Sequence, residues 1–320
     1  MGLGFIGQEV ARAALRSEEV ELVAAVDKSP KLLGRPLSEV LGVPAGKLVV
    51  QPQLSEAAKG KKGAVLLHAT GSKLTHVSKE LFEAFELKLS VVSSCEELSF
   101  PWFRHPELAD KLDAAAKKHE VTVLGTGVNP GFVLDRLVAT AAQVCGPVRR
   151  IAATRIVDAR TRREALQRKV GAGLTEDEFF KLVEAESLGH VGLPESAALC
   201  ALGAGIDCDD FEEEIAPVIA EEDITGGAFV VKKGQVAGIH QSVAGLADGQ
   251  ERVRLELTIA VGAEPAGDTI EIDADPKVRL KIEGGVAGDQ ATANVMVNAA
   301  PRVQAAEAGL LTVLELPAGR

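Results

Sequence analysis

The sequence predicts an α/β fold in which a doubly wound parallel sheet is joined to a second, α+β domain with a mainly antiparallel sheet. Two observations predict it. Short apolar runs alternate with helix-like segments up to about residue 132, as parallel α/β sheets require. Residues 228–283 instead form successive short runs in which charged and apolar residues alternate, as in half-exposed strands. A chain of 320 residues is long enough for two such domains.

The first element is a glycine-rich turn with the pattern G-x-G-x-x-G. It consists of Gly2, Leu3, Gly4, Phe5, Ile6 and Gly7. Such glycines let a strand turn tightly into a helix, here residues 8–16, while a pyrophosphate touches the backbone at the helix N-terminus. A buried-strand run follows at Val20–Val26 and ends at Asp27, where an acid accepts a hydrogen bond from an adenosine ribose. The pattern predicts a Rossmann-type dinucleotide site, and a glycine turn without a ligand is the alternative.

The same motif requires a strand ahead of Gly2. We therefore expect an apolar run upstream of Met1 in a longer natural chain. After Asp27 in the sequence, the side chains of Lys28, Ser29 and Arg35 offer contacts for a 2′-phosphate. Both NAD and NADP are therefore left open as the cofactor.

The next elements place small polar turns at strand ends. A strand-like run at 48–50 is followed by a buried strand at 63–70, a helix at 74–85 and a strand at 89–94. Ligands bind at the carboxyl ends of parallel strands. The turns at these ends predict further cofactor contacts at Ala69, Thr70, Gly71, Ser94 and Cys95.

Paired acids, Glu96 and Glu97, follow the strand at 89–94 and precede Leu98, Phe100 and Trp102. A carboxylate in apolar surroundings has a raised pKa and exchanges protons near neutrality. We predict Glu96 as a catalytic acid/base. One of the pair is expected to face solvent, which makes Glu97 the weaker candidate. The alternative is a helix N-terminus, where Glu is favoured by the dipole.

A helix at 106–119 and a strand at 121–127 lead to Asn129, which is positioned to bond the nicotinamide carboxamide or is an ordinary turn residue. From about Val133 the pattern changes to a helix at 134–145 and a strand at 151–157. A basic cluster then surrounds Gln167. It fits either a carboxylate or phosphate site or, more commonly, a solvated helix face. Its members are Arg160, Arg162, Arg163, Arg168 and Lys169.

The remaining segments complete the second domain and return to the first. Thr175 caps a helix that runs to about residue 188, and residues 207–214 form an acidic surface segment. Strands are expected at 229–231, 235–241, 252–261, 269–272 and 277–282. A helix at 290–306 is bent or ended by Pro301, and the apolar tail at 310–316 docks on the first domain. The predicted domains are 1–132 with 289–320, for the dinucleotide, and 133–288, for the substrate and dimerisation.

The bulk composition narrows the class of partner. A net charge of −11 argues against nucleic acid and anionic membranes. The sequence shows no 18-residue apolar run and no signal peptide, which predicts a cytoplasmic protein. The four cysteines have no metal spacing, so we expect free thiols and no metal site.

Five motifs occur in the same order as in 2,4-diaminopentanoate dehydrogenases and the similar native amine dehydrogenases, which resemble dihydrodipicolinate reductase in fold. They are the glycine turn, Ser94-Cys95-Glu96-Glu97-Leu98, Gly127-Val128-Asn129-Pro130-Gly131-Phe132, Gly189-His190-Val191-Gly192-Leu193 and Val297-Asn298-Ala299-Ala300-Pro301. The resemblance implies NAD(P)-dependent interconversion of an amine with a carbonyl compound and ammonia. It also implies an acid/base at Glu96, with the register relative to Glu97 open, and a homodimer.

Four further site residues are predicted. The predicted substrate pocket contains Phe132, His190 and His240, and Asn298 is predicted to contact the cofactor. Each of the two histidines fits a structural role as well. Two other functions compete with an amine dehydrogenase. A dihydrodipicolinate reductase-like imine reductase would need a loop rich in His and Lys, which we do not find. A sensor that binds nicotinamide nucleotides without chemistry would have no use for the Glu96–Glu97 pair.

Overall fold

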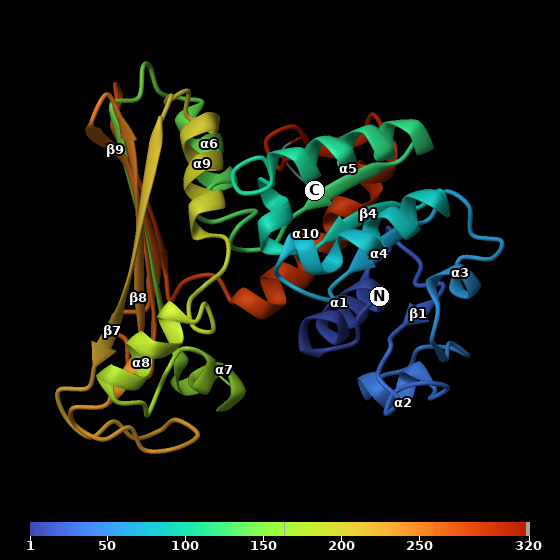
Figure 1. The fold of residues 1–320 in the computed structure, drawn as a ribbon, viewed down its shortest axis with the longest axis horizontal. Coiled ribbons are helices and arrows are strands. Elements are labelled where there is room, and N and C mark those ends of the chain that lie inside the picture. Colours follow the sequence, from blue (N-terminus) through green and yellow to red (C-terminus); the bar gives the residue numbers. More distant parts are fainter. Residues whose placement is uncertain (163, 318–320) are drawn as a thin grey trace. The chain divides into compact units, whose positions relative to one another are not determined.

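The computed structural model describes residues 1–162 and 164–317. The chain divides into two compact units, Met1–Phe132 with Ala287–Arg320 and Val133–Val286 (Figure 1). Arg163 of the predicted basic cluster lies outside the described residues. The first unit contains two parallel sheets, and the second unit contains one mixed sheet.

The first unit contains a four-stranded parallel sheet in the order β12-β5-β4-β3. Its strands are β3 (Val65–His68), β4 (Ser90–Ser93), β5 (Thr122–Gly125) and β12 (Gly309–Leu311). The helices around it are α4 (Leu74–Glu86), α5 (Pro106–His119) and α10 (Gly288–Ala305). The core joins apolar side chains of α4, α5 and the strands, including Phe85, Leu112 and Val123. The pairing of β12 with β5 confirms that the apolar tail docks on the first domain.

A second, two-stranded parallel sheet belongs to the same unit. β1 (Ala25–Val26) pairs with β2 (Val50–Gln51), and α1 (Phe5–Arg16), α2 (Leu37–Leu41) and α3 (Leu54–Ala57) accompany it. The glycine turn connects the two sheets: Gly2 N–H donates to Val26 O at 2.9 Å, and Ala69 N–H donates to Met1 O at 2.9 Å. The first residues of the chain thus run between β1 and β3.

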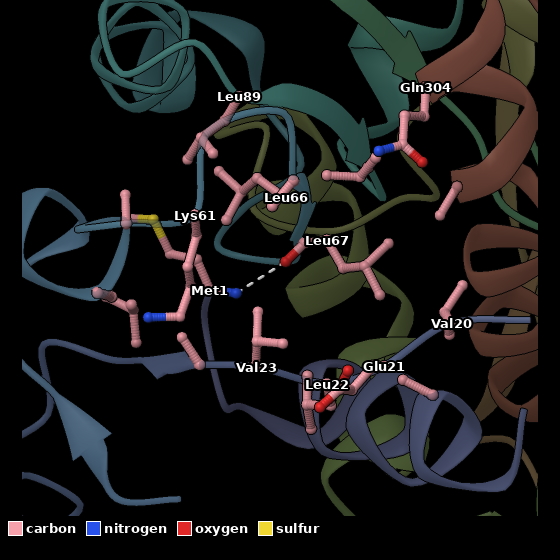
Figure 2. Close-up of a pocket in the computed structure, with 18 of the residues that line it drawn as sticks. Met1, Val20, Glu21, Leu22, Val23, Lys61, Leu66, Leu67, Leu89 and Gln304 are labelled. Carbon is pink, nitrogen blue, oxygen red and sulfur yellow. Dashed lines mark hydrogen bonds between the residues drawn. The ribbon is translucent and has the colours of Figure 1, made fainter.

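The predicted strand at Val20–Val26 is largely wrong, because only Ala25–Val26 pair and Val23 is 38% exposed. A cavity of about 320 Å³ lies beside this segment. Figure 2 shows Leu22 and Val23 on one side of it and Leu66 and Leu67 on the other. Strand pairing needs a neighbour about 4.8 Å away, and no strand of the described residues occupies this space. The expectation of a strand ahead of Gly2 stays a prediction.

The second unit is built on a six-stranded sheet in the order β11-β10-β6-β9-β8-β7. Only the β6–β9 pair is parallel, so the prediction of a mainly antiparallel sheet is confirmed. The strands are β6 (Arg150–Asp158), β7 (Asp210–Ile219), β8 (Val236–Ala247), β9 (Gln250–Ala260), β10 (Gly267–Asp273) and β11 (Val278–Glu283).

Helices cover one face of this sheet, where α9 packs on β8 and β9, and α6 packs on α9 and β10 (Figure 1). The helices of this unit are α6 (Arg136–Ala142), α7 (Glu164–Lys169), α8 (Glu176–Glu184) and α9 (Leu193–Gly203). The predicted cap of α8 is confirmed, because Thr175 and Glu178 form a reciprocal capping box. α6 is shorter than the predicted 134–145.

Two expectations about secondary structure are corrected. Phe229–Val231 is no strand, and Val231 only bridges to Ile224. The acidic segment at 207–214 is largely exposed as expected, and it leads into the edge strand β7, where charges are tolerated better than in a central strand. α10 is not ended by Pro301 and continues to Ala305.

Candidate functional site

In the glycine turn, a side chain would clash with backbone atoms at Gly2 and Gly7 but not at Gly4. A Cβ atom on Gly7 would lie 1.7 Å from Gly2 O. Gly2 has φ +80°, and a Cβ there would lie 2.4 Å from Ala69 O. Gly4, the N-cap of α1, has φ −62° and no neighbour within 4 Å of its Cβ position. The turn therefore leaves room above Gly4, next to the N-terminus of a 12-residue helix, where an anion is stabilised.

Asp27 lies against this turn. Its Oδ2 accepts a hydrogen bond from Leu3 N–H at 2.6 Å, and its Oδ1 accepts one from Ser29 N–H at 2.6 Å. Each carboxylate oxygen accepts more than one hydrogen bond, so Asp27 keeps acceptor capacity for a ribose hydroxyl. The structure thus brings together the turn and the acid that the sequence separates by about 20 residues.

The ends of β3 and β4 meet the glycine turn at the same sheet edge. Ser94 N–H donates a hydrogen bond to His68 O at 3.0 Å, and Ala69 N–H donates one to Met1 O. Cys95 is different, because its side chain is wholly buried and its thiol donates to Ser72 O at 3.2 Å. Burial raises the pKa of this thiol far above its usual range. The Cys95 side chain is therefore a packing group, and a cofactor contact at Cys95 stays a prediction.

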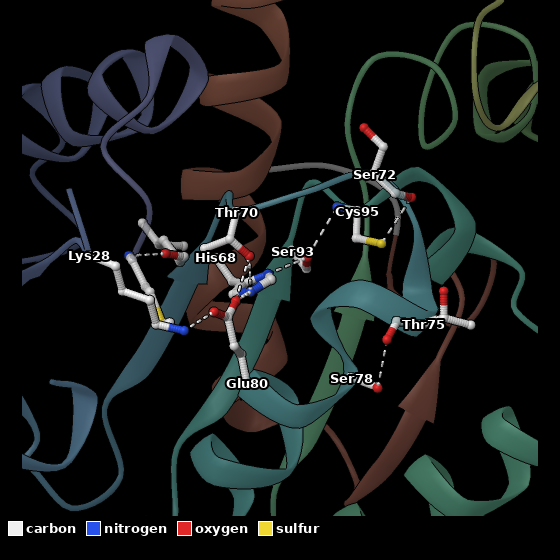
Figure 3. A network of polar contacts seen from close by, with 11 residues as sticks. Lys28, His68, Thr70, Ser72, Thr75, Ser78, Glu80, Ser93 and Cys95 are labelled. Carbon is white, nitrogen blue, oxygen red and sulfur yellow. Dashed lines mark hydrogen bonds and ion pairs between the residues drawn. The ribbon is translucent and has the colours of Figure 1, made fainter. Parts of the chain in front are cut away.

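A polar network at this edge joins the predicted Lys28 and Thr70 to three residues that the sequence analysis did not single out, Glu80, His68 and Ser93 (Figure 3). Glu80, on α4, accepts from Lys28 Nζ at 2.6 Å through Oε1 and from Thr70 Oγ1 at 2.6 Å through Oε2. The ring of His68 is buried between Glu80 Oε2, at 3.0 Å from Nε2, and Ser93 Oγ, at 2.8 Å from Nδ1. No sequence signal marks Glu80, because a glutamate on an amphipathic helix ordinarily faces water.

The charges in this network follow from its contacts. Hydrogen bonding from His68, with further bonds from Lys28 and Thr70, lowers the pKa of Glu80 to about 2. Desolvation lowers the pKa of His68, so its imidazole is neutral at neutral pH. Glu80 is therefore a fixed carboxylate, and Lys28 is the only one of its three side-chain partners that carries a charge.

The paired acids follow β4 on a 3₁₀ turn, Glu96–Ser99. Glu97 Oε2 accepts from Leu74 N–H at 2.6 Å, which caps the start of α4, and lies 3.1 Å from His105 Nε2. Glu97 is 7% exposed and Glu96 is partly buried, so the expectation that one of the pair faces solvent is wrong. The contacts give Glu97 a structural task and make Glu96 the better candidate for chemistry.

Glycine also lets this acidic turn approach the sheet. A Cβ on Gly125, at the end of β5, would lie 2.4 Å from the carbonyl carbon of Leu98. Leu98 is wholly buried, and the Phe100 and Trp102 rings lie 6.1 Å apart. Leu98 and the two rings thus pack directly after the acids in the chain, and an apolar setting for the Glu96 carboxylate stays a prediction.

The segment that carries Asn129 packs on α10 in the same unit. Val128 N–H donates to Thr292 Oγ1 at 3.2 Å. Gly131 has φ +126°, and a Cβ there would lie 2.3 Å from Gly127 N, so only glycine allows this loop. Asn129, Phe132 and Asn298 are each partly buried.

The two predicted pocket histidines are not brought together. His190 is held through its backbone, which donates to Gln241 Oε1 at 2.8 Å and accepts from Gln241 Nε2 at 2.9 Å. His240 precedes Gln241 on β8, and its Nδ1 lies 3.0 Å from Thr258 Oγ1. Because successive side chains of a strand point to opposite faces, His190 and His240 do not line one pocket within a chain.

The basic cluster is paired with acids nearby. Arg160 bonds Asp158 at 2.7 Å and also Glu264, and Arg168 bonds Glu164 at 2.7 Å. Gln167, wholly buried, donates to Arg160 O and Arg162 O and so orders the segment. Arg160 and Arg168 thus each have an acidic partner close by, and a carboxylate or phosphate site at this cluster stays an open alternative.

Within residues 1–162 and 164–317, no helix is long and apolar enough to cross a membrane, and no group of three or more His, Cys, Asp or Glu side chains is arranged for a metal. All four cysteines are free thiols.

Comparison with solved structures defines the class of protein first. The chain is similar to an amine dehydrogenase from Mycobacterium smegmatis, with a TM-score of 0.85 and 25% identity over 100% of this chain and 95% of that chain. An oxidoreductase from Agrobacterium radiobacter, solved with NAD⁺, L-tartaric acid and magnesium, shares the fold at a TM-score of 0.57 and 9% identity, over 97% of this chain and 89% of that chain. The fold is that of two-domain dehydrogenases.

The family follows from sequence. Residues 132–320 match the family model for the 2,4-diaminopentanoate dehydrogenase C-terminal domain. The 2,4-diaminopentanoate dehydrogenase of Acetoanaerobium sticklandii is 30% identical over 328 residues, which cover 100% of this chain and 93% of that protein. The chain belongs to the 2,4-diaminopentanoate dehydrogenase family, which confirms the resemblance drawn from its motifs.

Proposed function

We propose that this chain is an NAD(P)-dependent amine dehydrogenase that interconverts a primary amine with the carbonyl compound and ammonia. Membership of the family supports the class of reaction. The observation that carries the proposal is one of placement: Asp27 and the Glu96 segment follow the ends of β1 and β4, and the glycine turn is hydrogen-bonded to residues at the ends of β1 and β3. A dinucleotide and an acid/base would therefore be held by the same unit.

The residues present fit a nicotinamide dinucleotide. The open space at Gly4 suits a pyrophosphate against the α1 N–H groups, and Asp27 suits the adenosine ribose. We assign Thr70, Gly71, Ser94, Asn129 and Asn298 to the rest of the cofactor, which is NAD or NADP. When bound, the nicotinamide would accept or donate the hydride.

The chain's own chemistry concerns protons. An ammonium ion has no lone pair to drive hydride departure, so Glu96 would first accept a proton from the substrate nitrogen. Once the hydride has left the substrate carbon, the nitrogen is part of an iminium ion, and Glu96 would release its first proton to solvent. Water would then attack the iminium carbon while Glu96 takes the proton that this water loses. Return of that proton to the nitrogen would let ammonia leave, as the hydroxyl proton is lost and the carbonyl forms. Phe132 and His190 are proposed for the substrate, and Arg160 and Arg168 each have a nearby acid as partner.

The test is amine-dependent reduction of NAD⁺ and NADP⁺ with 2,4-diaminopentanoate, simple primary amines and cyclic imines in one panel. We expect turnover with at least one amine and ammonia-dependent oxidation of the reduced cofactor with the matching carbonyl compound. Reduction of cyclic imines alone would favour the reductase alternative. Cofactor binding without any turnover would favour the sensor.

We further propose that the second unit forms a homodimer through the helix-free face of its sheet. This face carries polar side chains from neighbouring strands, among them Thr154, His240, Glu256 and Thr258. An antiparallel sheet face can lie against water or against a second copy, and the homodimer that the family resemblance implies favours the copy. A cytoplasmic location stays a prediction.

Light scattering at micromolar concentration is expected to give twice the chain mass. Thr258→Arg places a charge on the proposed interface and should shift the mass towards the monomer, whereas Thr75→Arg on exposed α4 should not. A monomer mass for the unaltered chain, or an unchanged mass for Thr258→Arg, would contradict this interface.

A further inference from the structure

We propose that Glu80 sets the cofactor preference of this chain towards NAD by holding Lys28, the cation next to Asp27, in an ion pair. This inference rests on the proposed dinucleotide site and names the residue that decides between its two cofactors. NADP differs from NAD by a phosphate on the adenosine 2′-hydroxyl, so the charges around Asp27 decide which of the two is bound more tightly.

Glu80 is the anchored member of the pair. The Lys28 side chain is 69% exposed and the Glu80 side chain 15% exposed, with 2.6 Å between Nζ and Oε1. Thr70 and the buried His68 hold the other carboxylate oxygen of Glu80 at 2.6 and 3.0 Å (Figure 3). The exposed Lys28 side chain therefore pairs with the Glu80 carboxylate, whose position is fixed by residues of α4 and the end of β3.

The other charged residues discussed for this site, Arg35 and Asp27, have partners of their own. Arg35 lies 3.7 Å from Glu39, an exposed pair. Asp27 is held by two backbone N–H groups and presents a negative charge where the ribose is expected. Lys28 is thus paired with Glu80, while the neighbouring Asp27 keeps its own negative charge. A phosphate would meet net negative charge there, whereas a ribose hydroxyl would donate to Asp27.

Glu80→Gln removes the charge that holds Lys28 and keeps a side-chain oxygen for Thr70. The freed ammonium then becomes available to a phosphate as a charge-assisted donor. We expect the affinity ratio of NADP⁺ to NAD⁺ to rise on the order of 10-fold, the size of one hydrogen bond to a charged group. Glu83→Gln is the matched control, because Glu83 lies on the same helix and acts on Lys28 only through charge.

The readout is the dissociation constant of NAD⁺ and of NADP⁺ by calorimetry, repeated with AMP and adenosine 2′,5′-bisphosphate, for which no turnover is needed. Addition of Lys28→Met to Glu80→Gln should abolish the gain. A gain that persists without Lys28, or an equal gain in Glu83→Gln, would overturn the proposal, since Glu80 would then act as a bulk charge.

A second arm does not depend on the folding of Glu80→Gln. Lys28→Met in the otherwise native chain should change the NADP⁺/NAD⁺ ratio less than about twofold, because the lysine is already engaged. A large loss of NADP⁺ affinity would show that Lys28 serves the phosphate in the native chain and would overturn the inference. Failure of the native chain to bind either dinucleotide would instead overturn the proposed function.

Discussion

Glu96→Gln is expected to lower kcat for reductive amination by about 10²–10⁴-fold, the contribution of a positioned general acid/base. Glutamine keeps the shape of the side chain and removes its ability to exchange a proton. The dissociation constant of the cofactor should change by no more than a few fold, because the pyrophosphate and ribose contacts are on other residues. Steady-state kinetics and calorimetry on the same preparation check both parts.

Glu97→Gln is the matched control. Glu97 accepts from Leu74 N–H and lies against His105, so its charge supports the start of α4. Its loss should cost roughly 1 kcal/mol of unfolding free energy and leave kcat within a few fold. If Glu97→Gln loses turnover while Glu96→Gln keeps it, the assignment is wrong by one residue. If both variants turn over normally, a carboxylate mechanism has to be abandoned.

Gly7→Ala is expected to lower the free energy of unfolding by roughly 2–4 kcal/mol, in the range of severe overpacking. Its Cβ would lie 1.7 Å from Gly2 O, which is backbone and does not rotate away. Relief requires the turn to move, and the turn also pairs with β1 and β3 through Gly2 and Met1. Thermal and denaturant unfolding should both show the loss, with cofactor affinity falling as well.

Gly4→Ala separates the packing role from the binding role. No neighbour lies within 4 Å of the Gly4 Cβ position and its φ of −62° suits alanine, so stability should stay within about 0.5 kcal/mol. Its methyl group would occupy the space proposed for the pyrophosphate, so NAD⁺ affinity should fall at least about 10-fold. Equal destabilisation by both alanines would contradict the turn geometry, and unchanged NAD⁺ affinity in Gly4→Ala would contradict the phosphate site.

The sequence by itself determined the elements whose signals are local. α5 runs over Pro106–His119 as predicted, because proline at its first position and an apolar stripe mark the helix without help from distant residues. The glycine turn and the capping box of α8 are equally local, since each depends on a few neighbouring residues. The association of the turn with Asp27 was also predictable, because a short helix and one strand bring the chain back to it.

Only the tertiary structure decided what depends on distant neighbours. Val20–Val26 has a strand's composition, but residues 20–24 lie beside a cavity, and strand pairing begins only at Ala25. The different tasks of Glu96 and Glu97 depend on Leu74 and His105, and the task of Glu80 depends on Lys28 and His68. Composition and residue type can be read directly from the sequence. The strand that a segment pairs with, and the charge that faces a glutamate, depend on residues that are distant in the sequence. From the sequence, Glu96 was the candidate acid/base with its register relative to Glu97 open, and contacts that only the fold supplies give Glu97 a separate structural role.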